Sequence, residues 1–201
     1  MSWEFLLTAF VVCVAPGIGV IYTLSSTLAG GLRGGMLAAT GCTLATMLHL
    51  GVAMAGLAAV LHTSAVLFQA VKYAGVAYLL WMAWSVLQSK GGLEIGASEP
   101  APGWQVVRRG IVLNILNPKL PMFFVAFLPQ FLPAQGAHLH QMIALGLGFS
   151  AMTFGVFVLY TGLAVSGRKA VLGSPRVMGW VRRAFAASFA ALGARLALER
   201  A

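Results

Sequence analysis

Long stretches without a charged side chain dominate the sequence: residues 5–32, 34–71, 73–89 and 120–167. A helix that crosses the hydrocarbon core of a bilayer needs about 20 mostly apolar residues. Divided at their polar turns, these stretches and the C-terminal region predict six transmembrane helices, over 4–26, 36–60, 66–88, 108–130, 141–165 and 180–198. The sixth is the weakest, because Arg182, Arg183 and Arg195 interrupt its apolar run.

Composition excludes a soluble globular domain. Of 201 residues, 60% are hydrophobic and 8% are charged, whereas soluble domains carry about 25% charged residues. The net charge of +9 does not predict a nucleic-acid partner, because the basic residues separate apolar stretches instead of forming a patch interleaved with aromatic residues. The chain is therefore expected to be an all-α polytopic protein whose surroundings are the lipid bilayer.

The loops that carry positive charge predict the orientation. Basic residues gather in two long connections, at about 90–109 and 166–180, whereas the turn at 129–140 has no Lys or Arg. Since cytoplasmic loops are enriched in Lys and Arg, both connections are expected in the cytoplasm. With six spans this places both termini outside; Arg195 and Arg200 argue mildly for the opposite.

Two prolines suggest an internal repeat. Pro16 and Pro118 lie about half the chain apart, each near the middle of the first predicted span of its half. Three spans per half is an odd number, so the second half crosses the membrane in the opposite sense, which is an inverted repeat. We expect a single membrane domain over 1–201, with repeat one at about 1–90, a cytoplasmic loop at about 90–109 and repeat two at about 108–201.

The residues around these prolines form the candidate substrate site. A proline within a helix frees the carbonyl one turn earlier, and membranes tolerate such backbone where it lines a cavity. Gly17 and Gly19 follow the first proline and ease unwinding, while Asn114 and Asn117 precede the second at helical spacing and so face one cavity. Two interpretations are open, a substrate site or a pair of packing kinks; the matched positions and the adjacent amides favour the site.

Two ionisable residues in the spans are further candidates. Lys119 is the basic residue placed near the midplane, at a cost of roughly 2.5–3.5 kcal/mol, and a substrate carboxylate is its expected partner; the alternative is a lysine that snorkels to the interface. His49 lies midway along the second span, where it either relays a proton or, as we favour, is a neutral histidine bonded between helices. Tyr22, Tyr78 and Tyr160 are interpreted as anchors or packing more readily than as path residues.

The stretch Gly110-Ile-Val-Leu-Asn-Ile-Leu-Asn-Pro-Lys119, then Phe123-Phe124 and Leu128-Pro-Gln-Phe131, resembles the LysE/RhtB family of amino-acid exporters (lysine exporter and homoserine/threonine-resistance translocators). Residues 41–49 and 72–79 also resemble its second and third spans. The resemblance implies a bacterial inner-membrane transporter of small amino acids, proton exchange and a homodimer. Where the family usually has Pro-Gly-Pro-Asn, this chain has Pro16-Gly-Ile-Gly19, which concerns the substrate more than the fold.

The missing acids narrow the predicted substrate. Away from their ends the spans carry no Asp or Glu, so they offer neither a carboxylate cage for a metal nor a countercharge for a cationic substrate. We therefore expect no metal and no cofactor. We predict a secondary transporter, not an enzyme, that exports neutral zwitterionic amino acids such as threonine, homoserine or leucine-type substrates by alternating access. The alternatives are a thiol-redox conduit using Cys13 and Cys42, and a non-transporting membrane subunit.

Overall fold

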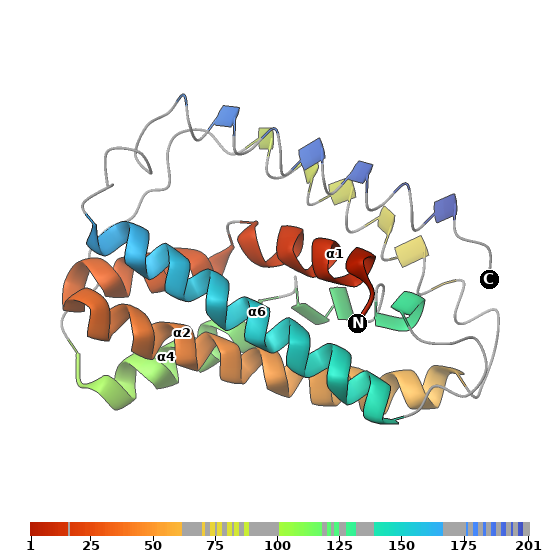
Figure 1. Cartoon of the computed structure of the whole chain (residues 1–201), viewed down its shortest axis with the longest axis horizontal. Helices are drawn as coiled ribbons and strands as arrows, with labels where there is room; N and C mark the ends of the chain where they lie inside the picture. The colour runs from red at the N-terminus through yellow and green to blue at the C-terminus, as the bar shows by residue number, and fades with distance from the viewer. Residues whose placement is uncertain are drawn as a thin grey trace.

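Every regular element in the described part of the chain is a helix, and no strand occurs there. The computed structural model describes residues 1–15, 17–61, 101–117, 120–121, 123–124, 128–131 and 139–166, with further short or single helical positions between 70 and 88 and between 176 and 198. Its elements are α1 (Trp3–Val14), α2 (Ile18–Leu61), α4 (Gly103–Ile115), the short 3₁₀ helix η1 (Leu128–Phe131) and α6 (Leu139–Val165). Figure 1 shows α4 alongside α2 and α6 running across α2, with α1 on the other side of α6.

The first predicted span is a broken helix. The helix α1 ends at Val14, two residues before Pro16, and α2 begins at Ile18, so the interruption lies where the proline predicts it. Ser2 caps the start of α1 by accepting a hydrogen bond from the Phe5 N–H at 3.2 Å. The predicted span over 4–26 thus comprises α1 and the start of α2.

The boundary between the first two predicted spans is a sharp bend inside α2. Gly31 has φ 60° and ψ −152°, a conformation that glycine alone adopts readily. Beyond the bend the helix packs closely against the turn before it. A Cβ at Gly34 would collide with the Ser26 carbonyl oxygen, and one at Gly35 would collide with the Thr27 hydroxyl. The sequence predicted a connection at 27–35, whereas the helix continues to Gly30 and resumes at Leu32.

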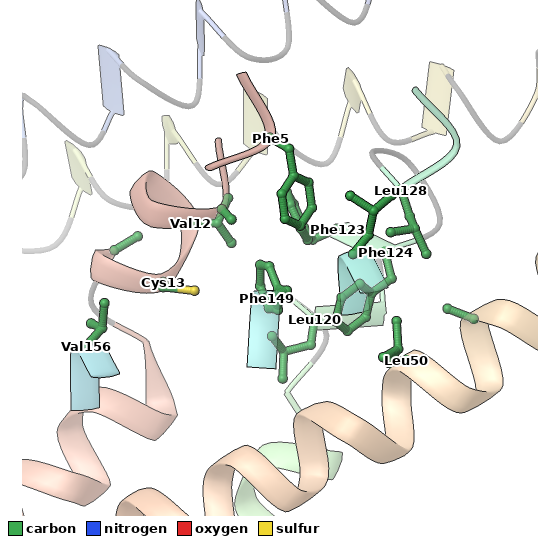
Figure 2. Packing of buried hydrophobic residues seen from close by; sticks show 14 of the residues in the cluster. Phe5, Val12, Cys13, Leu50, Leu120, Phe123, Phe124, Leu128, Phe149 and Val156 are labelled. Carbon is green, nitrogen blue, oxygen red and sulfur yellow. The ribbon is translucent and has the colours of Figure 1, made fainter. Parts of the chain in front are cut away.

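The core is an aromatic cluster around Phe149 of α6. The Phe149 ring lies 5.0 Å, between centroids, from the rings of both Phe123 and Phe124, while Phe5 of α1 meets Phe131 of η1 edge-on at 5.3 Å. These are separations at which aromatic rings attract one another. Figure 2 shows Phe123, Phe124 and Phe149 together beside Phe5 and Leu128. The Phe-Phe and Leu-Pro-Gln-Phe sequences therefore contribute core residues.

Two stretches in the described chain are long and apolar enough to cross a membrane. They are Ile18–Met54, which contains the bend, and Leu139–Val165, with mean hydropathies of 1.5 and 2.1. The second buries Phe149 and Phe157 but exposes Leu147 and Leu159, so it is apolar on every side. A helix of that kind suits a position between a protein core and lipid. The predicted spans over 66–88 and 180–198 lie largely outside the described residues.

Candidate functional site

A small cavity lies where the broken first span faces the end of α4. Its volume is about 30 Å³, and its lining comes from α1, α2, α4 and α6 and from residues just beyond helix ends: Val12, Cys13, Ala15, Gly17, Gly19, Val20, Asn114, Asn117, Leu120, Phe149, Thr153 and Phe157. Such a space holds about one or two water molecules and no larger solute. In this form the cavity is therefore too small to hold an amino acid.

Four of the candidate substrate residues line the cavity together. Gly17 and Gly19 come from the break and the first turn of α2, and Asn114 and Asn117 from the last turn of α4 and the second residue beyond it. The two pairs are nearly a hundred positions apart in the sequence. The residues beside the two predicted breaks therefore share one site.

The end of α1 leaves a carbonyl that another helix satisfies. The last carbonyls of an α-helix have no partner within the helix. At the end of α1 the Ala15 N–H donates to the Val11 carbonyl at 3.1 Å, and the chain then leaves the helix. The Val14 carbonyl accepts a hydrogen bond of 2.8 Å from the Tyr160 hydroxyl of α6. This bond joins the broken helix to α6.

The end of α4 has a matching arrangement. Within a helix the Asn114 carbonyl would accept from residue 118, but that residue is a proline and has no N–H. The carbonyl instead accepts from the Asn117 N–H at 3.2 Å and from His49 Nε2 at 3.1 Å. Because a carbonyl oxygen only accepts, Nε2 of His49 carries a proton. His49 therefore bonds α2 to the end of α4.

The two asparagine side chains form a short chain of hydrogen bonds across the site. Asn114 Nδ2 donates to the Cys42 carbonyl of α2 at 2.8 Å, and Asn114 Oδ1 accepts from Asn117 Nδ2 at 3.2 Å. Both side chains are buried. Since an unpaired amide in a buried position costs free energy, these bonds hold the amide groups in one orientation.

Gly19 brings α2 close to these amides. A Cβ at this position would lie 3.1 Å from Asn114 Oδ1 and 3.0 Å from Cζ of Phe157 on α6. The backbone at Gly19 thus lines the cavity directly, and any side chain at this position would reduce the space in it. The glycine that stands at the family's asparagine position is therefore packed tightly.

The other predicted residues fall elsewhere. Pro16, Pro118 and Lys119 lie outside the described residues, so their roles stay predictions. His49 bonds between helices, as in the interpretation we favoured, and is not among the lining residues. Pattern analysis missed Phe149 and Phe157, which lie one turn on either side of Thr153 on one face of α6. The four-residue spacing was visible, but α6 is apolar on every side, so the pattern did not single out this face.

The two cysteines occupy different environments. Cys13 lines the cavity, with its sulfur 3.3 Å from the Thr153 hydroxyl, and in Figure 2 that sulfur points from α1 toward Phe149. Cys42 is fully buried on α2, with its sulfur 3.7 Å from the Gly110 carbonyl of α4. They form no disulfide. Because redox exchange needs accessible thiols, this arrangement gives the thiol-conduit alternative no support.

Metal ligands do not gather in the described part of the chain, where no group of three or more His, Cys, Asp or Glu side chains could hold an ion. What the described lining offers is two amides, a hydroxyl, a thiol and an apolar surface made mainly by Phe149, Phe157 and Leu120. Such a mixture suits a small solute with both polar and apolar parts.

Comparison with known proteins gives a consistent result. The model of the LysE type translocator family matches residues 10–200. The chain is 31% identical over 171 residues to a leucine efflux protein of Enterobacter sp. (strain 638), covering 82% of this chain and 80% of that protein. It is 28% identical over 201 residues to a homoserine/homoserine lactone efflux protein of Salmonella typhimurium, covering 98% and 96%. An uncharacterized membrane protein of Vibrio cholerae is 30% identical over 199 residues, with the same coverage. No solved structure matches the chain.

Proposed function

Because this chain belongs to the LysE type translocator family, a family of membrane transporters, we propose that it exports a small amino acid across the bacterial cytoplasmic membrane. The single observation that carries the proposal is the shared cavity, where residues beside both predicted breaks meet. The relatives named for leucine efflux and for homoserine or homoserine lactone efflux point to the same substrate class.

The substrate we propose is neutral and zwitterionic. The described lining residues include no acid that would attract a cationic side chain. Asn117 and Thr153 offer hydrogen bonds to the polar end of the substrate, and the predicted partner of its carboxylate is Lys119. Phe149 and Phe157 offer apolar contact to an aliphatic side chain.

The architecture we propose has six transmembrane helices arranged as two inverted repeats, with both termini outside. The likeness of α1 and α4 supports it: each has a tryptophan in its first turn, Trp3 or Trp104, and each ends shortly before a proline. In inverted repeats of this kind, broken helices meet at a site near the bilayer midplane. The homodimer implied by the family resemblance belongs to the same proposal.

Transport would proceed by alternating access. The cavity of about 30 Å³ is too small for an amino acid, so it would widen toward the cytoplasm for loading and toward the outside for release. We further propose that an inward flow of protons drives export. His49 would relay such a proton only if its contact with α4 breaks during the cycle.

Efflux from loaded cells or vesicles tests the proposal, using labelled leucine, threonine, homoserine and lysine. We expect export of the neutral amino acids, and a loss of at least tenfold in Asn117→Ala and Lys119→Ala at equal amounts of protein in the membrane. The matched control is Gln105→Ala, which removes an amide on α4 away from the cavity lining and should leave export intact. An absence of export across the panel would favour the non-transporting subunit.

A further inference from the structure

Two side chains that do not line the cavity bond to the ends of helices that do. Each of these bonds joins the first half of the chain to the second. Tyr160 of α6 donates to the Val14 carbonyl at the end of α1, and His49 of α2 donates to the Asn114 carbonyl at the end of α4. We propose that Tyr160 and His49 are positioning residues that keep the substrate cavity closed and its amides oriented. This inference rests on the proposed function for its meaning in transport, but its geometry does not depend on it.

The first contact closes the wall between α1 and α6. Cys13, the residue before Val14, lines the cavity and meets Thr153 of α6 at 3.3 Å. Tyr160 lies two turns beyond Thr153, on the same face of α6, and reaches Val14. The Tyr160 hydroxyl therefore fixes the end of α1 to α6 at the residue next to Cys13, which lines the cavity.

The second contact fixes the wall between α2 and α4. Asn114 is held twice by α2: its side chain donates to the Cys42 carbonyl, and its own carbonyl accepts from His49, two turns further along. Since residue 118 has no N–H to offer, loss of the imidazole would leave this carbonyl with the Asn117 N–H as its partner among the described residues. By holding the backbone of Asn114 in place, His49 thereby controls how the side-chain amide of Asn114 faces the cavity.

Separation of α1 from α6, or of α4 from α2, would stretch one of these bonds. These two pairs of helices supply walls of the cavity, and a solute larger than about two waters requires some of its walls to separate. Both bonds are formed in this structure, where the cavity is too small for an amino acid. Removing one should shift the population toward open forms by the factor that an ordinary hydrogen bond represents.

Cys13 provides a direct measure of opening, because it lines the cavity and is buried. In a Cys42→Ser background in membranes, the rate of Cys13 alkylation by N-ethylmaleimide reports access to the cavity. We expect Tyr160→Phe to raise this rate about three- to tenfold. The reaction requires no transport, so it tests the inference separately from the proposed function.

The matched control is Tyr22→Phe. The Tyr22 hydroxyl also donates to a backbone carbonyl at 2.8 Å, that of Val106 on α4, but Tyr22 does not line the cavity and Val106 lies near the start of α4, away from the end that does. The same chemical change should leave Cys13 alkylation at the parent rate. An equal rise in both variants, or no rise in Tyr160→Phe, would overturn the role of Tyr160.

Two variants of His49 test the second contact through export kinetics. Glutamine can keep a donor near Nε2, whereas leucine cannot. We expect His49→Leu to raise the KM for export at least threefold and His49→Gln to restore most of it. If His49 served only to stabilise the fold, both variants would have less protein in the membrane and a correspondingly lower maximal rate, with KM unchanged. That result would refute the assignment of His49 as a positioning residue. If export is absent from the unsubstituted protein while the alkylation difference persists, the proposed function fails and the role of Tyr160 stands.

Discussion

Substitution of Gly19 by alanine tests how tightly the cavity is built. The added methyl group would lie 3.0 Å from Cζ of Phe157 and 3.1 Å from Oδ1 of Asn114, both closer than ordinary van der Waals contact. One of these neighbours must move by a few tenths of an ångström. Overpacking of this kind costs about 1–3 kcal/mol.

The cost falls on the site itself, because Gly19 and both neighbours line the cavity. If about 1 kcal/mol of it opposes the seating of substrate against Asn114, the KM for export rises about fivefold. Efflux of labelled substrate over a range of internal concentrations gives KM and maximal rate separately. Immunoblots of the membrane fraction correct the maximal rate for protein amount.

Gly51→Ala is the matched control, since a Cβ there meets nothing within 4 Å and the residue lies in the same helix. It should leave KM unchanged and, by removing an interior helical glycine, stabilise the protein by about 0.5–1 kcal/mol. A KM for Gly19→Ala within twofold of the parent value, at equal protein amount, would show that the space beside Asn114 does not hold substrate.

Three further predictions follow from packing and from the acid-free lining. Gly31→Ala should destabilise the protein by roughly 1–3 kcal/mol, measured as a lower melting temperature in detergent, because its φ of 60° with ψ −152° excludes a side chain. Phe149→Ala should cost about 3–5 kcal/mol in the same assay, since it removes the ring at the centre of the aromatic cluster; retention of the parent melting temperature would contradict that description of the core. In competition assays, unlabelled lysine should inhibit leucine efflux at least tenfold more weakly than homoserine does, and selective lysine export would refute the neutral-substrate proposal.

Local chemistry made part of this structure predictable. Proline cannot continue a helix ladder, so the break after Val14 and the end of α4 near Ile115 followed from Pro16 and Pro118. The spacing of the two asparagines likewise indicated that they face one cavity. These inferences succeeded because each depends on residues within one or two helical turns.

Contacts between distant helices were beyond the sequence pattern. The apolar stretch of α6 does not distinguish the face that carries Phe149 from the face that meets lipid, because both are hydrophobic. The bond from Tyr160 to Val14 joins a side chain to a backbone carbonyl, and every residue offers such a carbonyl. The start of α4 was also missed: the helix begins at Gly103, ahead of the apolar stretch, and the guanidinium of Arg108 lies over the ring of Trp104 at 5.1 Å.

The bond between Tyr160 and Val14 also has a consequence for biosynthesis. A ribosome makes residue 14 long before residue 160, so in the proposed architecture the first helices enter the bilayer before the hydroxyl that satisfies the end of α1 exists. A carbonyl without a hydrogen-bond partner is costly in lipid. Until α6 is made, water or the insertion machinery must therefore donate a hydrogen bond to the Val14 carbonyl. The N-terminal half is therefore completed only when α6 has been inserted beside it. Chains truncated before α6 should be recognised by membrane quality control even though every residue of the first helices is present.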